Sequence, residues 1–238
     1  MLDIIQDDDY LIAINKPAGL MPVAPPPPPK EAAKAPKPVT LEDEVKKYLA
    51  KRYKLPNADA IYLSAITYPD TETSGVALFA KTTSAARFLK TGLEKRSFNF
   101  QFWALTASRP KLEQGNLVHY LRYAYAQDAM QVFTNNQPGT QKATLRYELL
   151  AALGNSNLLV INSHTNIPQQ VRAQLARIGC PARGDKKYGD TKTAAAKIVF
   201  VHLRTLSFVH PHNSQPVTLY AYVNDREQLW RTFAHFDE

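Results

Sequence analysis

One acidic side chain stands on a Pro-led turn between two apolar segments. The stretch TYPDTETSGVALFAK, residues 67–81, places Asp70 directly after Pro69 and shortly before an apolar run. Pro-Asp is ordinary turn chemistry and an aspartate often caps its own turn, so a solvated turn is one interpretation. The other interpretation is a carboxylate held at the mouth of a site, where it could act on a substrate.

Arg172 is the second candidate for chemistry. It lies about two turns into a segment with a helical pattern, residues 165–179, and follows the apolar Val171. A cation gains nothing from the helix dipole toward the N-terminal end, and an arginine placed there ordinarily faces solvent. A carboxylate at the N-terminal side of the helix would be a specific reason for its position.

The elements that must hold these residues are strands in runs with a few helices between them. Thr40 with Asp43 three residues later predicts an N-capped helix over 40–54, and Ser84 and either Thr165 or Asn166 are expected to cap two more. This order predicts an α+β fold with a mixed, largely antiparallel sheet and flanking helices. The expected helices are 40–54, 84–96, 165–179 and 225–235, and the expected strands are 9–19, 60–66, 76–81, 98–107, 157–163, 197–211 and 216–223, with hairpins in 108–157.

We expect a single domain over 1–238, with a Pro-rich excursion at 22–39 that cannot pack into a core. The 29 Lys and Arg against 21 Asp and Glu favour a polyanionic partner such as RNA or DNA. A single cysteine fits a reducing compartment, and neither a signal peptide nor a membrane-spanning run is recognisable. We therefore expect a cytoplasmic protein without a membrane or metal site, since the histidines and the cysteine lack metal-binding spacing.

Several ordered stretches together resemble the RluA-type RNA pseudouridine synthases. Family members carry a Lys-Pro-Ala-Gly turn, a His-Arg-Leu-Asp-x-x-Thr-Ser-Gly motif, a Lys-x-Tyr-x-Ala-Leu strand, a Thr-Gly-Arg-x-His-Gln-x-Arg segment, a Gly-Asp-x-x-Tyr-Gly turn and a final stretch with Leu-His-Ala and x-Phe-x-His-Pro. The counterparts here are INKPAGL (14–20), TYPDTETSGVALFAK (67–81), FQFWAL (100–105), TNIPQQVR (165–172), IGCPARGDKKYG (178–189) and VHLRTLSFVHP (201–211).

The resemblance implies the pseudouridine synthase catalytic-domain fold and an isomerase that converts uridine to pseudouridine in rRNA or tRNA. It implies that Asp70 is the catalytic carboxylate, acting on a uridine flipped out of the RNA strand, without a cofactor or metal. Arg172 is then its paired arginine, expected to hold the Asp70 pKa low and to fix its rotamer. Phe102 is expected to stack on the base. We assign substrate binding to Lys16, Tyr68, Thr73 and Gln170.

The chain also departs from the family pattern. Thr67 and Tyr68 replace the family's His-Arg, Phe102 replaces its Tyr, and 166–169 replaces Gly-Arg-x-His. An alternative is therefore a catalytically weak or inactive member that binds RNA or a protein. The retained Asp70 and Arg172 oppose it, because a binding protein has no need of a costly buried ion pair. A general basic interaction module would explain the charge but not the ordered motifs.

Four further side chains receive structural assignments. His202 and His210 lie on strand patterns and are expected to be satisfied within the sheet. Asp185 and Tyr188 are expected to order and pack within the Gly-Asp-x-x-Tyr-Gly turn. For the whole chain we expect a monomer.

Overall fold

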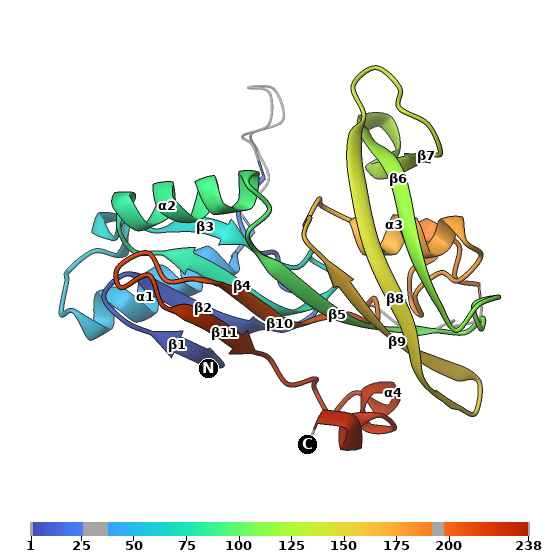
Figure 1. Cartoon of the computed structure of the whole chain (residues 1–238). Helices are drawn as coiled ribbons and strands as arrows, with labels where there is room; N and C mark the ends of the chain where they lie inside the picture. The colour runs from blue at the N-terminus through green and yellow to red at the C-terminus, as the bar shows by residue number, and fades with distance from the viewer. Residues whose placement is uncertain (1, 26–37, 192–197, 238) are drawn as a thin grey trace.

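A twisted sheet runs through the molecule (Figure 1). The computed structural model describes residues 2–25, 38–191 and 198–237, so most of the expected Pro-rich excursion at 22–39 lies outside the described residues. Within them, eleven strands have the order β1-β2-β4-β10-β5-β9-β8-β6-β7, with β3 on β4 and β11 on β10. The strands are β1 Ile4–Asp7, β2 Leu11–Lys16, β3 Ser64–Thr67, β4 Ser74–Ala80, β5 Asn99–Thr106, β6 Gln114–Ala124, β7 Ala129–Phe133, β8 Gln141–Leu153, β9 Ser156–Ser163, β10 Val201–Val209 and β11 Pro216–Tyr220.

Helices flank this sheet, and the α+β class with a largely antiparallel sheet is confirmed. The helices are α1 Leu41–Arg52, α2 Thr83–Glu94, α3 Gln170–Arg177 and the short α4 Gln228–Arg231. Figure 1 shows α1 and α2 on the half of the sheet that holds β1 to β4, and α3 beside the tall β6, β7 and β8. No helix in the described ranges has the length and apolar character needed to cross a membrane.

Successive side chains of a strand point to opposite faces, and this explains how helices cover both faces of the half of the sheet that holds β1 to β4. Ile12 and Ile14 of β2 pack with Leu41, Val45 and Leu49 of α1. The intervening β2 side chains face the other way and share a core with α2. Because successive strand side chains point to opposite faces, an uninterrupted apolar strand needs a helix on each side.

The two halves of the sheet meet at a narrow parallel junction. Ser74 and Gly75 of β4 pair with His202 and Leu203 of β10, and this pairing is the parallel one among the described strand pairs. Gly75 has φ +117°, and a Cβ built there would lie 2.3 Å from the Leu203 carbonyl oxygen. Only glycine allows this approach, which accounts for the Gly of the Thr-Ser-Gly motif. The junction therefore fixes the loop that precedes β4, where Asp70 lies.

Helix starts were predicted with mixed success. The capping box of α1 is confirmed: the Asp43 N–H donates to Thr40 Oγ1 at 3.1 Å, and the Thr40 N–H donates to Asp43 Oδ2 at 3.1 Å. The cap of α2 is Thr82 and not Ser84. Helix α3 begins at Gln170 with Gln169 as its N-cap, so the expected start at Thr165 or Asn166 was wrong.

Other boundaries differ locally. The expected strand 60–66 is a 3₁₀ turn, Ala58–Ala60, followed by β3. The expected helix 225–235 is α4 with a further 3₁₀ turn, Ala234–Asp237. The expected strand 197–211 is present as β10, and residues 192–197 lie outside the described ranges.

Candidate active site

A pocket of about 490 Å³ opens between the end of α2, the loop before β4 and the loop before α3. Its lining includes Tyr68, Asp70, Thr73, Phe102 and Arg172. Gln170 lines it as well, so six of the residues selected from sequence are brought to one cavity. Its size is within the range of small-molecule and nucleotide sites.

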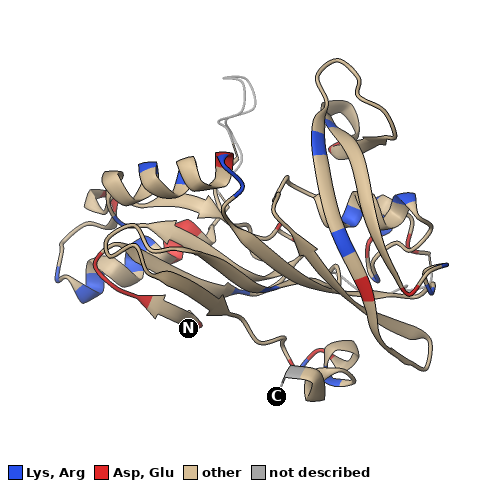
Figure 2. Cartoon of the chain, viewed as in Figure 1, with Lys and Arg blue, Asp and Glu red and all other residues tan. Residues whose placement is uncertain are grey.

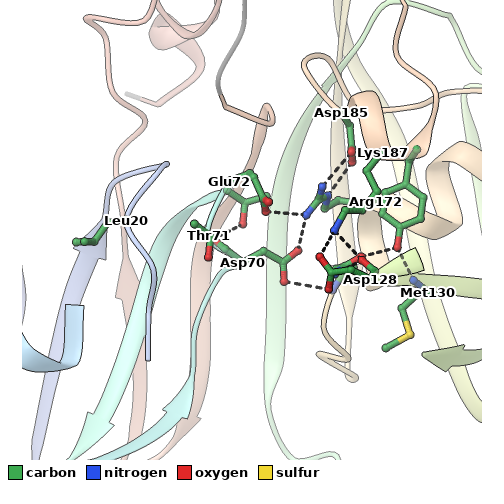
Figure 3. A network of polar contacts seen from close by, with 12 residues as sticks. Leu20, Asp70, Thr71, Glu72, Asp128, Met130, Arg172, Asp185 and Lys187 are labelled. Carbon is green, nitrogen blue, oxygen red and sulfur yellow. Dashed lines mark hydrogen bonds and ion pairs between the residues drawn. The ribbon is translucent and has the colours of Figure 1, made fainter. Parts of the chain in front are cut away.

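Two protein groups hold the Asp70 carboxylate. Arg172 Nη1 donates to Asp70 Oδ2 at 3.2 Å, and the Gln169 backbone N–H donates to Oδ1 at 3.3 Å. Thr73 closes the turn behind it, since its backbone N–H and its Oγ1 each lie 3.2 Å from the Asp70 carbonyl oxygen, to which both donate. The Asp70 side chain keeps 21% exposure and lines the pocket. Figure 3 shows its carboxylate beside Glu72 and Arg172. Asp70 is thus no solvated turn residue.

Arg172 is the centre of a buried charge network and lies in the first turn of α3, nearer the N-terminus than expected. Its Nε donates to Asp185 Oδ2 at 2.7 Å and its Nη2 to Asp185 Oδ1 at 3.0 Å. Its Nη1 reaches both Asp70 and Glu72, the latter at 3.0 Å. The Arg172 side chain is 3% exposed and that of Asp185 is fully buried. The planar guanidinium is therefore oriented by Asp185 and presents one nitrogen to the pocket.

Sequence reasoning missed two members of this network. Asp185 was expected only to order its own turn, and Glu72 was not selected. The available signal was the presence of acidic residues inside the two motifs that carry Asp70 and the Gly-Asp turn. One arginine needs several acceptors when it is buried, because it has five N–H donors.

The electrostatics of Asp70 correct an expectation. Burial raises the pKa of the Asp70 carboxyl above its ordinary value, although Arg172 and the Gln169 N–H oppose this and Glu72 adds to it. The predicted net lowering by Arg172 was wrong because desolvation outweighs the pairing. For Arg172, bonding to Asp185 raises the guanidinium pKa despite its burial, so Arg172 stays charged.

Lys16 lies under the site and not in it. Its side chain is fully buried, and Nζ donates to the carbonyl oxygens of Pro17 at 2.8 Å, Leu20 at 2.9 Å and Thr71 at 3.3 Å. Burial lowers the Lys16 pKa to about 8, against the favourable influence of Asp70 and Glu72. The ammonium therefore ties the Lys-Pro-Ala-Gly turn to the loop that carries Asp70, and it is absent from the pocket lining.

The remaining predicted binding residues divide into two groups. Tyr68 is half-buried in the pocket wall, and burial followed by the Asp70 charge raises its pKa. Phe102 lines the pocket and stacks with Phe100 at 6.4 Å between ring centroids. Gln170 has its amide engaged elsewhere: Oε1 accepts from the Ile167 N–H at 3.2 Å, and Nε2 contacts Thr144 and Ser163. Gln170 lines the pocket while its amide supports the loop before α3, and its expected role in substrate binding stays a prediction.

Two of the departures from the family pattern contact each other. The Asn166 side-chain amide donates to Thr67 Oγ1 across the pocket wall. Thr67 ends β3 and Asn166 lies in the loop before α3, so the contact joins two separate segments of the pocket.

The histidine predictions are confirmed. His202 Nε2 donates to the Ala221 carbonyl at 2.9 Å, which leaves Nδ1 to accept from Ser74 Oγ at 2.8 Å. Burial lowers the His202 pKa to about 4, so the ring is neutral. His210 Nε2 lies 3.3 Å from Asp8 Oδ2. Across the described part of the chain, no cluster of His, Cys, Asp and Glu has the arrangement of a metal site.

Asp70 and the buried Arg172 thus meet at a pocket of a mixed α+β fold. The model of the RNA pseudouridylate synthase family matches residues 10–177. The chain belongs to this family, and the resemblance to its RluA type is confirmed. It is accordingly an isomerase of the RNA pseudouridine synthase class, with RNA as its substrate.

Curated relatives extend the match along most of the chain. The tRNA pseudouridine synthase C of Haemophilus ducreyi is 27% identical over 96% of this chain and 93% of that protein. The ribosomal large subunit pseudouridine synthase D of Nitrosomonas europaea is 30% identical over 90% of this chain but only 60% of that protein. The chain thus spans nearly all of one relative and under two thirds of the other.

A solved structure has the same fold. The human RNA pseudouridylate synthase domain containing 4 superposes with a TM-score of 0.71, covering 98% of this chain and 92% of the human chain. At 22% identity, this likeness supports the fold alone.

Proposed function

We propose that this chain isomerises uridine to pseudouridine in structured RNA, rRNA or tRNA, with the Asp70 carboxylate as the reacting group and without a cofactor. The observation that carries the proposal is the geometry of Asp70, which is bonded by Arg172 and the Gln169 N–H and exposed only toward a pocket. A duplex conceals the glycosidic bond of a stacked nucleotide, so the target uridine must be flipped into the pocket.

In this proposal the carboxylate acts at C1′ of the ribose, either by direct attack or by promoting a glycal. The bond between C1′ and N1 breaks, the uracil turns, and a bond between C1′ and C5 forms. The proton lost from C5 is balanced by one gained at N1, so the product is an isomer. Arg172 keeps its positive charge and stabilises the ionised Asp70.

Phe102 supplies the aromatic face on which the uracil stacks. Its ring lines the pocket and is 6% exposed. It has no hydroxyl to accept the C5 proton, so that proton must go to another group. Once released from the sugar, the Asp70 carboxylate is a base within the same pocket and is suited to that step.

Basic side chains beside the pocket are suited to the RNA backbone. Figure 2 shows Lys and Arg along α2 and β8. The exposed members are Arg87, Lys90, Lys95 and Arg96 near α2, and Lys142 and Arg146 on β8. Each phosphate that they neutralise would make binding more salt-dependent. We also propose that the protein is a cytoplasmic monomer with a single domain. The continuous sheet, which contains β1 to β11, supports the single domain.

The test is to map pseudouridine in RNA from cells with the wild-type chain, with Asp70→Asn, and without the gene. We expect at least one uridine that is modified only with the wild-type chain. If no site depends on Asp70, the proposed catalysis is wrong, and the alternative of an RNA-binding or protein-binding member with little activity takes its place.

A further inference from the structure

The backbone at Gln169 is unusual for its residue type. Gln169 caps α3 with φ 59° and ψ 10°, in the left-handed region that non-glycine residues seldom adopt. This conformation directs its N–H to Asp70 Oδ1. A residue held there against its preference needs support from its surroundings.

The support comes from the Gln169 side chain. Tyr188 donates its hydroxyl proton to Gln169 Oε1 at 2.6 Å, and Gln169 Nε2 donates to the Asp128 carbonyl at 3.4 Å. The Tyr188 oxygen in turn accepts from the Met130 N–H at 2.7 Å, which leaves its own proton for Gln169. Burial raises the Tyr188 pKa to about 12, so the hydroxyl remains a donor at neutral pH.

Tyr188 shares one short turn with Asp185. Asp185 caps the 3₁₀ turn Lys186–Tyr188. From this turn, Asp185 orients Arg172, which bonds Asp70 Oδ2, and Tyr188 orients Gln169, which bonds Asp70 Oδ1. The three-residue spacing of Asp and Tyr thus serves both oxygens of one carboxylate.

The same turn is tied to the segment between β6 and β7. Lys187 Nζ donates to the Asp128 carbonyl at 2.6 Å and to Asp128 Oδ2 at 2.7 Å. Asp128 is itself in the left-handed region, with φ 48°. The segment 128–130, the turn and Gln169 are therefore joined by bonds to Lys187 and Tyr188.

We propose that Tyr188 is a positioning residue for Asp70, acting through Gln169. The 185–188 turn then orients the two oxygens of Asp70 by two separate relays, each a chain of hydrogen bonds. One relay runs from Asp185 through Arg172, and the other runs from Tyr188 through Gln169. The catalytic consequence rests on the proposed function. The relay itself is a property of the folded chain and is measurable without RNA.

The test uses Tyr188→Phe in the full chain, which keeps the ring over Arg172 and removes only the hydroxyl. Tyr147→Phe is the matched control, because that buried tyrosine bonds the Leu112 carbonyl at 3.3 Å and does not line the pocket. The first measurement is the titration of the Asp70 carboxyl by carbon-13 NMR, with Asp70→Asn to assign the signal. We expect the Asp70 pKa to rise in Tyr188→Phe and not in Tyr147→Phe, because a hydrogen bond to the ionised form is weakened.

The second measurement uses the RNA found to depend on Asp70. In Tyr188→Phe we expect the single-turnover rate constant to fall about tenfold while the RNA dissociation constant stays the same, since an oriented bond to a charged group is weakened. Gln169→Gly keeps the left-handed backbone and the N–H but loses both side-chain anchors, so it should show the same effects. The double variant should be no worse than either single one.

An unchanged Asp70 pKa in both Tyr188→Phe and Gln169→Gly overturns the relay, whatever the activity. A raised pKa with an unchanged rate constant retains the relay and overturns its catalytic role. If no RNA depends on Asp70, the proposed function fails while the titration still decides whether the relay exists.

Discussion

Asp185 bonds Arg172 through two nitrogens, whereas Asp70 shares the third nitrogen of the same guanidinium with Glu72. The bidentate pair is buried, while Asp70 is partly exposed in the pocket lining and Glu72, two residues later in the chain, is partly exposed as well. Arg172 is thus held by one buried carboxylate and shares its remaining contacts between two carboxylates that are partly exposed. The three carboxylates therefore differ in burial and can be distinguished by mutation.

Asp185→Asn should cost both stability and activity. The variant removes the charge that compensates a buried arginine, and breaking such a pair costs about 3–5 kcal/mol. We expect the free energy of unfolding in urea to fall by about that amount and pseudouridine formation to be lost. The control is Glu113→Gln, at an exposed Arg109–Glu113 pair, which should change unfolding by less than about 1 kcal/mol. Equal effects of the two variants would contradict the central place given to Asp185.

Glu72→Gln should shift the pH dependence of the reaction. Glu72 raises the pKa of Asp70, so its neutralisation lowers that pKa. The proposed reaction uses the ionised carboxylate, so activity should be lost as the pH falls through the Asp70 pKa. The acid limb of the single-turnover profile should therefore move to lower pH in Glu72→Gln. Glu44→Gln, at an exposed position of α1, should leave the profile in place. A shift to higher pH would show that the loss of Glu72 acts mainly by disordering Arg172.

The raised pKa of the Asp70 carboxyl also makes the stability of the fold depend on pH. The Asp70 pKa is higher in the folded chain than in the unfolded chain. At a pH between these two values, the folded chain therefore binds more protons than the unfolded chain. The contribution of Asp70 to stability therefore improves as the pH falls through that range. We expect Asp70→Asn to be more stable than the wild type near neutral pH, and this advantage to shrink on acidification. Urea unfolding at several pH values measures it, and an advantage that grows on acidification would contradict a raised pKa.

Gly75→Ala should disrupt the junction between the two halves of the sheet. The new Cβ would meet the Leu203 backbone at 2.3 Å, and the positive φ adds strain. We expect a loss of about 4 kcal/mol or more, read as a lower thermal midpoint with loss of activity. Gly154→Ala is the matched control, with φ +56° and open space around its Cβ, and should cost only about 1 kcal/mol. Similar losses in both variants would mean that backbone strain, and not the contact with β10, sets the requirement at Gly75.

Short sequence patterns predicted well those helix and strand features that depend only on residues nearby in sequence. The Thr40 capping box and the apolar run of β2 depend on neighbours in sequence. The capping box was found as expected, and β2 lies within the expected strand 9–19. The start of α3 was mistaken because its two expected caps have distant partners: Thr165 Oγ1 contacts the Thr144 carbonyl, and Asn166 contacts Thr67.

Long-range features of the site were out of reach. The motifs placed Asp70 and Arg172 together, but nothing near Arg172 in sequence indicated Asp185 as its main partner. The left-handed Gln169 was equally hidden, since positive φ is ordinarily signalled by Gly or Asn. The raised pKa of Asp70 depends on how much water the assembled pocket excludes, which no short sequence pattern encodes.

The contact between Thr67 and Asn166 should be energetically coupled. These residues replace a His and a Gly of the family pattern, and they bond each other across the pocket wall. A double-mutant cycle with Thr67→Val and Asn166→Ala should give a coupling of about 1 kcal/mol in urea unfolding, the usual value of a neutral hydrogen bond. As a control, the cycle of Thr67→Val with Asn162→Ala should give none, because Asn162 contacts Gln101 instead. Since the contact joins two walls of the pocket, each single variant should also weaken RNA binding more than it slows the single-turnover step. Additive free energies in the first cycle would show that the hydrogen bond between Asn166 and Thr67 does not stabilise the fold.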